Sequence, residues 1–232
     1  MRESLNNPAF FLPGMKYRLV CFDLDGTLVD ETKSVWESIH TFLNIDQERR
    51  RKAMEKYYTR EITYQEWADH DMAMWAERNV KKEDFLKAIS HLRLMEGTRE
   101  TLHELKKRGY KLVLLSGSLS LVLDLLIPDY KEVFDHTYIN HIFFDEDGNI
   151  SGADWLGHPS DEEGKAEELK EVCRRFGIPL GQSVFVGDEK NDLGAIELAG
   201  LGIAFNSQSE KLNQVADIII EKKDVREILK HL

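Results

Sequence analysis

Short apolar runs alternate with longer amphipathic stretches along most of this 232-residue chain. Lys111–Ser118 and Val184–Val186 contain runs with the length of buried strands, whereas Thr101–Arg108, followed by Gly109, has the spacing and the closing glycine of a helix. Strands that alternate with helices form mainly parallel sheets covered by helices. The pattern therefore predicts an α/β fold with a mainly parallel, Rossmann-like sheet, and further strands at Gly202–Phe205 and Asp217–Ile220. The segments Tyr138–Phe144 and Ile150–Gly152 are predicted to form a hairpin, because Asp147-Gly148 between them is a strong turn signal.

Residues 33–94 interrupt this pattern. They lack strand-like alternation and instead show apolar residues at helical intervals, with Ser34 in the position of a helix N-cap. Trp67, Met74 and Trp75 recur at such intervals and are expected to form the interior of this segment. We predict a core made of residues 1–32 and 95–232, with an inserted helical domain at 33–94.

The first apolar run, Leu19–Phe22, leads directly into Asp23-Leu24-Asp25-Gly26-Thr27. Side chains at positions i and i+2 lie on one face of a strand, so two carboxylates are expected to lie together at its end. Their repulsion requires a cation or a shared proton, and a hard divalent ion meets that need. Taken alone, an Asp-x-Asp sequence is more often a strand that runs into an acidic turn.

Three further segments place polar residues where apolar runs end or a helix begins. Ser116 and Gly117 close one strand, Asp188 and Asp192 follow another, and Lys165 lies near the start of a helical pattern. In open α/β sheets, ligands bind beyond the carboxyl ends of the strands, where such segments can converge. Each also has a simpler interpretation, namely a turn serine, a surface lysine and helix-capping acids.

The four motifs taken together are more specific than any one of them. In their order, the chain from Tyr17 onward resembles the haloacid dehalogenase-like hydrolase superfamily, and within it the phosphoserine phosphatase group. The features that carry this resemblance are Asp23-Leu24-Asp25-Gly26-Thr27, Ser116-Gly117, Lys165, Gly187-Asp188 with Asn191-Asp192, the long insert after the first motif and the return at Glu96-Gly97. The resemblance implies that the helical insert is a cap over an active site.

The resemblance also implies residue roles. Asp23 is the expected nucleophile that attacks phosphorus, and Asp25 the expected general acid and then base. Magnesium is the expected cofactor, bound by the Asp23 carboxylate, the Asp25 backbone carbonyl and Asp188, with Asp192 acting through water. The phosphoryl oxygens are expected to contact Ser116, the Gly117 amide, Lys165 and Asn191. Donors and a metal suit phosphoryl transfer, which depends mainly on positioning and charge neutralisation.

Substrate recognition departs from the pattern of that group. Phosphoserine phosphatases hold the substrate amino group with an acid shortly after the first motif, a role open to Glu31 here, although its offset is one residue short. They hold the carboxylate with a cap arginine, but Asp69 stands in its approximate place, and an anion cannot replace a guanidinium group. Arg60 and Arg78 are the alternatives on neighbouring turns. Ser118 replaces a second glycine.

The expected reaction is therefore hydrolysis of a small phosphorylated metabolite. A phosphosugar mutase of the same superfamily and a non-catalytic protein that binds a phosphate ligand remain as alternatives. Mutases keep both aspartates, whereas dehalogenases lack the second one.

Charge and composition limit the classes of binding partner that the protein is expected to have. The formal net charge of −11 argues against nucleic acid or an anionic membrane as the main partner. Residues 1–14 contain an apolar patch too short for a signal peptide, so we interpret them as an N-terminal extension. No apolar run has the roughly 18 residues that span a bilayer. The two cysteines, Cys21 and Cys173, are expected to be buried free thiols. These features suggest a cytoplasmic enzyme, either monomer or homodimer.

Overall fold

A computed structural model describes residues 14–156 and 161–232. The predicted N-terminal extension lies outside these residues, apart from Gly14.

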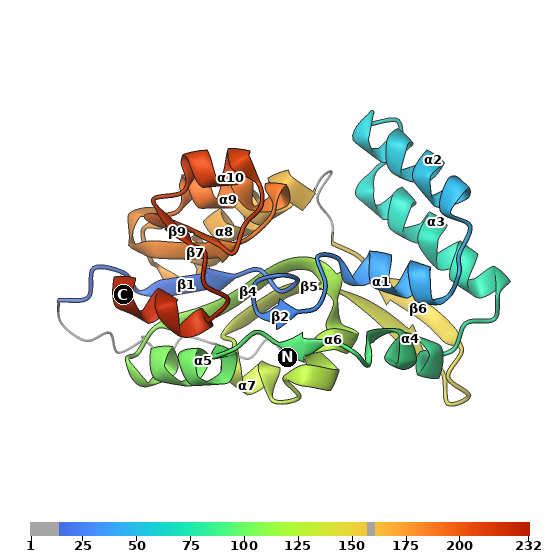
Figure 1. Ribbon diagram of the computed structural model, residues 1–232, viewed down its shortest axis with the longest axis horizontal. Coiled ribbons are helices and arrows are strands. Elements are labelled where there is room, and N and C mark those ends of the chain that lie inside the picture. The colour runs from blue at the N-terminus through green and yellow to red at the C-terminus, as the bar shows by residue number, and fades with distance from the viewer. Residues whose placement is uncertain (1–13, 157–160) are drawn as a thin grey trace.

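A seven-stranded sheet in the order β6-β5-β4-β1-β7-β8-β9 forms the centre of the described chain (Figure 1). Neighbouring strands are parallel except β5 and β6, which form an antiparallel hairpin. The α/β fold with a mainly parallel sheet is thus confirmed. The strands are β1 (Leu19–Phe22), β4 (Lys111–Leu119), β5 (His136–Phe144), β6 (Ile150–Asp154), β7 (Ser183–Gly187), β8 (Leu201–Phe205) and β9 (Ile218–Ile220).

Alternation along the strands supplies apolar side chains to both faces of the sheet. In β1, Val20 and Phe22 belong to one buried cluster, and Leu19 and Cys21 belong to the other. Figure 1 shows helices on both faces. On one side lie α8 (Asp161–Phe176), α9 (Leu193–Leu198) and α10 (Glu210–Val215); on the other lie α5 (Thr98–Lys107), α6 (Ser120–Leu126), α7 (Tyr130–Val133) and the 3₁₀ helix Val225–His231.

The hairpin and the cysteines follow the sequence-based expectation. The turn between β5 and β6 has Gly148 at φ +79°, and the Gly148 N–H donates to the Asp145 carbonyl at 3.0 Å. Cys21 and Cys173 are both buried and unbridged.

The helical insert comes between two short strands, β2 (Val29–Asp30) and β3 (Arg93–Leu94), which pair in antiparallel fashion at its base. Its helices are α1 (Val35–Phe42), α2 (Gln47–Tyr58), α3 (Tyr64–Glu77) and α4 (Lys82–Ile89). As expected, Ser34 caps α1, its Oγ accepting from the Glu37 N–H. Trp75 and Met74 are buried, whereas Trp67 is only partly buried. The domain boundaries at 33 and 94 remain a prediction.

Candidate active site

The two aspartates of the first motif lie in a turn and not on one face of a strand. β1 ends at Phe22; the Asp23 N–H still donates to the Val186 carbonyl at 2.9 Å, and the chain then turns. The Leu24 carbonyl accepts from the N–H groups of both Leu28 and Val29. The expectation that the strand continues to about Asp25 is therefore wrong, because these turn hydrogen bonds replace the strand pairing. Both carboxylates are nevertheless buried: Asp23 is 4% exposed and Asp25 is 9% exposed.

A glycine allows the first motif to approach the acidic loop after β7. Gly26 has φ +77°, and a Cβ atom at this position would lie 2.2 Å from Asp188 Oδ2. Only glycine fits this contact, since both the backbone conformation and the space exclude a side chain. The neighbouring Thr27 hydroxyl donates to Asp188 Oδ1 at 3.3 Å. The two acidic segments, 161 residues apart in sequence, are thereby brought together.

Lys165, near the start of α8, connects these carboxylates. Its side chain is 1% exposed, and its Nζ lies 2.9 Å from Asp23 Oδ1 and 2.6 Å from Asp192 Oδ1. The surface-lysine interpretation is thus wrong. The capping interpretation is partly right for Asp192, whose Oδ2 accepts from the N–H groups of Asp188 at 3.0 Å and Glu189 at 3.2 Å. Asp192 therefore positions both the lysine and the loop that carries Asp188.

The carboxylates of Asp23, Asp188 and Asp192 form a cluster in which one oxygen of each lies within 4.8 Å of the others. Burial, followed by the negative charges of neighbouring carboxylates, raises the pKa of Asp188. Burial likewise raises the pKa of Asp192, although Lys165 opposes it. One lysine cannot balance three buried carboxylates. An all-oxygen donor set with excess negative charge suits a hard divalent cation such as Mg²⁺.

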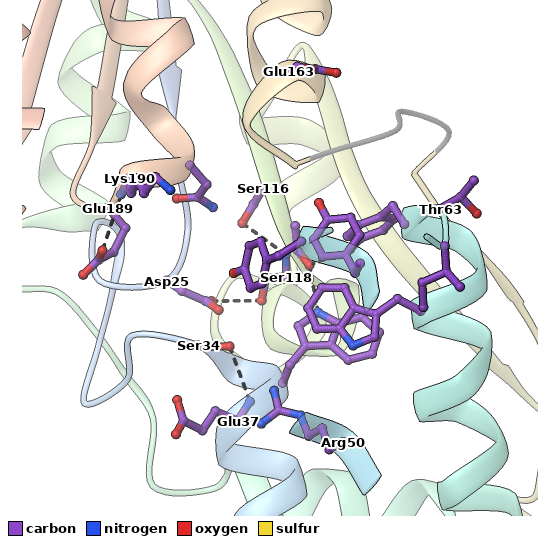
Figure 2. Close-up of a pocket in the computed structure, with 18 of the residues that line it drawn as sticks. Asp25, Ser34, Glu37, Arg50, Thr63, Ser116, Ser118, Glu163, Glu189 and Lys190 are labelled. Carbon is purple, nitrogen blue, oxygen red and sulfur yellow. Dashed lines mark hydrogen bonds between the residues drawn. The ribbon is translucent and has the colours of Figure 1, made fainter. Parts of the chain in front are cut away.

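The carboxyl group of Asp25 is not part of this cluster and has its own hydrogen-bond partners. Its Oδ1 accepts from the Ser118 hydroxyl at 2.9 Å, and its Oδ2 accepts from the Val35 N–H, at the start of α1, at 2.8 Å. Figure 2 shows the contact between Asp25 and Ser118. Burial and the nearby Asp23 charge raise the pKa of Asp25 to about 7, against the lowering effect of these two hydrogen bonds and of Lys165. A carboxyl group with this pKa can donate a proton near neutral pH.

The segment Ser116–Ser118 lies at the carboxyl end of β4. Ser116 is buried, and its Oγ accepts from the Ser118 N–H at 3.3 Å. The Gly117 carbonyl accepts from Trp36 Nε1 at 2.9 Å and from Asn140 Nδ2 at 2.8 Å. These bonds fix the segment beside Asp25.

A cavity of about 810 Å³ opens between these loops and the helical insert (Figure 2). The expected phosphate contacts Ser116, Gly117 and Asn191 line it, together with Asp23 and Asp25. Much of the remaining wall is aromatic and consists of Trp36, Tyr57, Tyr58, Tyr64 and Trp67. Arg50, from α2, adds a basic side chain to this wall. The cavity thus combines the carboxylates with a wall from the insert.

Several residues expected near the substrate lie elsewhere. Glu31 pairs with Arg93 at 2.9 Å and lines a different hollow. Asp69 is exposed and accepts from Trp155 Nε1 at 2.7 Å. Arg78 donates to the Leu43 carbonyl. Arg60 does line the cavity, but it is mostly exposed and pairs with Glu163.

Sequence reasoning missed Arg50 and Asn140. Arg50 stands in a run of charged residues typical of a solvated helix face. Asn140 lies in β5 beside the polar residues His136, Thr137 and His141, so its residue type alone does not mark it as a buried amide that needs partners.

A buried acid cluster lies with a lysine at the carboxyl ends of the parallel strands, under a helical insert. This is the position at which enzymes with open α/β sheets bind their ligands. The sequence matches the family model of haloacid dehalogenase-like hydrolases over residues 17–200. The chain belongs to this family, and within it the chain is phosphoserine phosphatase-like.

Similar proteins of known sequence and of known structure support this family membership. The chain is 32% identical to a phosphoserine phosphatase of Methanocaldococcus jannaschii, over 94% of this chain and 98% of that protein. It is also 32% identical to one of Archaeoglobus fulgidus, over 90% of this chain but 58% of that protein. A solved structure of a substrate-bound phosphoserine phosphatase complex matches with a TM-score of 0.72 and 28% identity, over 94% of this chain and 99% of that one.

Within the described part of the chain, no helix is both long and apolar enough to cross a membrane.

Proposed function

We propose that this protein is a Mg²⁺-dependent phosphomonoesterase that works through an aspartyl-phosphate on Asp23, and that O-phosphoserine is the first substrate to test. The observation that carries the proposal is the contact of Asp23 with buried Lys165, beside Asp188 and at the wall of the cavity. A solved structure of a phosphoserine phosphatase with an analogue of a phospho-aspartyl intermediate, at 28% identity, supports it.

In the first proposed step, an Asp23 carboxylate oxygen attacks phosphorus and the bond from phosphorus to the ester oxygen breaks. The carboxyl of Asp25 gives its proton to the leaving oxygen. In the second step, the Asp25 carboxylate takes a proton from water as the water oxygen attacks phosphorus. The bond between phosphorus and the Asp23 oxygen breaks, orthophosphate leaves, and Asp23 is again a carboxylate. Splitting one displacement into two easier ones is the advantage of a covalent intermediate.

The remaining residues hold charge in place. Lys165 faces the oxygens of Asp23 and is available to the phosphoryl group, while Ser116 and the Gly117 amide are the proposed neutral donors. Mg²⁺ is the proposed cation; Asp23, Asp188 and the Asp25 carbonyl would hold it, with Asp192 through water. A bound Mg²⁺ supplies neutralisation of phosphoryl charge.

The cavity offers its own partners for the leaving group in place of Glu31 and the expected arginine. Arg50 reaches into the cavity from α2 (Figure 2), is 13% exposed and lies 3.8 Å from the buried Asp71. Its Nε has no hydrogen-bond partner among the described residues. Glu37 on α1 also lines the cavity. We propose that Arg50 binds a carboxylate of the substrate and Glu37 an ammonium group, as phosphoserine requires.

The test is phosphate release from phosphoserine, sugar phosphates, nucleotides and p-nitrophenyl phosphate, with Mg²⁺ and with chelator. Chelator-sensitive release supports the reaction. If the wild-type protein binds Mg²⁺ but hydrolyses none of these esters, a binding protein is favoured. If it converts a sugar phosphate to an isomer without releasing phosphate, a mutase is favoured.

Arg50→Lys tests recognition separately. It should raise KM for phosphoserine by about 10-fold, because the planar fork is lost, and leave KM for p-nitrophenyl phosphate nearly unchanged. Arg60→Lys is the matched control at the exposed side of the same cavity. Equal effects of Arg50→Lys on both substrates would contradict the role of Arg50.

A further inference from the structure

Asn140, on β5, lies at the centre of a hydrogen-bond network that no step of the proposed reaction uses. Its side chain is fully buried. Nδ2 lies 2.8 Å from the Gly117 carbonyl, 3.2 Å from the Ser118 carbonyl and 2.8 Å from the Tyr64 hydroxyl. Oδ1 accepts from the Leu156 N–H at 3.0 Å. Only the amide NH₂ can face two carbonyl oxygens, so this orientation of the side chain is determined by its surroundings.

The Gly117 carbonyl receives donors from the core and from the insert together. Asn140 contacts it from β5, and Trp36 Nε1 contacts it from α1 at 2.9 Å. The Tyr64 hydroxyl, at the start of α3, lies 3.5 Å from the same oxygen and also accepts from Asn140. One carbonyl is therefore held jointly by two helices of the insert and one strand of the sheet.

The orientation of this carbonyl determines the orientation of neighbouring groups. A peptide unit is planar, so fixing the Gly117 carbonyl also fixes the direction of the Ser118 N–H, which donates to Ser116 Oγ. The Ser118 hydroxyl in turn donates to Asp25 Oδ1. A continuous chain of contacts thus runs from Tyr64 through Asn140 and the Gly117–Ser118 segment to Asp25.

We propose that Asn140 is a positioning residue that couples the seating of the helical insert, through Tyr64, to the geometry of Ser116 and Asp25. Asn140 itself is not among the residues that line the cavity. The proposal rests on the function proposed above, because it assigns Ser116 and Asp25 their catalytic roles. The proposal predicts that removing the hydroxyl oxygen of Tyr64, which belongs to the insert, lowers kcat.

Tyr64→Phe is the central test, because it removes that oxygen and keeps the ring that packs against Tyr57 and Trp67. We expect kcat and kcat/KM to fall together by about 3- to 10-fold, since an interaction that orients catalytic groups is lost. Tyr130→Phe, in a buried tyrosine of α7 remote from the cavity, is the matched control and should leave both constants unchanged. An unchanged kcat in Tyr64→Phe would overturn the proposal.

Asn140→Asp tests the centre of the network, since it places an oxygen against the two carbonyls at almost constant volume. We expect kcat to fall by about 100-fold, as for catalytic groups displaced by about 1 Å. Adding Tyr64→Phe should then cost little more, because the two residues act through one contact. If the decrease in kcat of the double variant equals the product of the two single decreases, the coupling is contradicted. The thermal midpoint of each variant shows whether it is folded.

Orthophosphate binding separates this proposal from the proposed function. In calorimetry with Mg²⁺, Tyr64→Phe should weaken orthophosphate binding by a few-fold relative to wild type and Tyr130→Phe. If no ester is hydrolysed but this weakening is seen, the proposed reaction fails and the coupling stands. If esters are hydrolysed and kcat does not change in Tyr64→Phe, the coupling fails alone.

Discussion

Carboxylates at the two ends of the central sheet have opposite electrostatic surroundings. At the carboxyl end, Asp23, Asp188 and Asp192 share a single lysine, Lys165. At the amino end, Asp135 alone is paired with two lysines, Lys111 Nζ at 2.7 Å and Lys106 Nζ at 3.0 Å, and accepts from the Leu112 N–H. At one end the carboxylates outnumber their lysine, whereas at the other end the charge of the single carboxylate is fully balanced by lysines.

The two ends consequently shift pKa values in opposite directions. Burial alone would raise the pKa of Asp135, but the hydrogen bonds from Lys111, the Leu112 N–H and Lys106 lower it. At the other end, burial and mutual repulsion raise the pKa of Asp188. Balanced carboxylates stabilise the fold, whereas a crowded cluster costs stability until a cation binds. The comparison indicates that the carboxyl end is built for binding and the amino end for stability.

Among the substitutions at the two ends, Asp23→Asn should have the largest effect, which is on turnover. The amide has nearly the same volume but is not a nucleophile, so we expect turnover to fall by at least about 10⁴-fold while the far-ultraviolet circular dichroism is unchanged. Asp69→Asn, at an exposed aspartate of the insert outside the cavity, is the matched control and should keep full activity. Retained phosphatase activity in pure Asp23→Asn would remove Asp23 from its proposed role.

Asp188→Asn should separate metal binding from stability. For wild type, saturating Mg²⁺ should raise the free energy of unfolding by about 1–3 kcal/mol, because the folded state binds the ion. The variant should lose this gain and about 100-fold or more of activity. In chelator, its thermal midpoint should equal or exceed that of wild type, since one repelling charge is gone. A large destabilisation of the variant in chelator would show that the cluster is not under repulsion.

The outcomes at the two ends also show what sequence reasoning can reach. The strands, the hairpin at Asp147-Gly148 and the convergence of Asp23, Lys165 and Asp188 follow from local pattern and from the rule that parallel strands end at one edge. Arg50 and the position of Asp69 could not be derived, because they depend on how each helix of the insert is rotated about its axis. That rotation is decided by packing of side chains distant in sequence, such as Trp36 against Trp75.

Asp135→Asn should destabilise the balanced end. The substitution leaves Lys111 and Lys106, both partly exposed, without their anion, so we expect the free energy of unfolding to fall by about 1–2 kcal/mol. Activity and the response to Mg²⁺ should not change. Asp129→Asn, which removes an exposed partner of Arg99, should cost less than about 0.5 kcal/mol in the same urea titrations. If the two variants behave alike, the Asp135 network adds nothing beyond a surface ion pair.

The smallest expected effect is the pH dependence of the difference in the free energy of unfolding between wild type and Asp135→Asn. The pKa of Asp135 is lower in the folded protein than the value of about 3.9 expected in the unfolded chain. Its contribution is therefore fully present above about pH 5 and is lost as pH falls through the folded pKa, because both states are then protonated. The lysines stay charged throughout this range. Urea titrations of wild type and Asp135→Asn from pH 7 to about 3 should show a constant stability gap down to about pH 5 and a narrowing gap below about pH 4. Other acids titrate equally in both proteins, so a gap that stays constant to the lowest pH would mean that the carboxylate charge of Asp135 is not what stabilises the amino end.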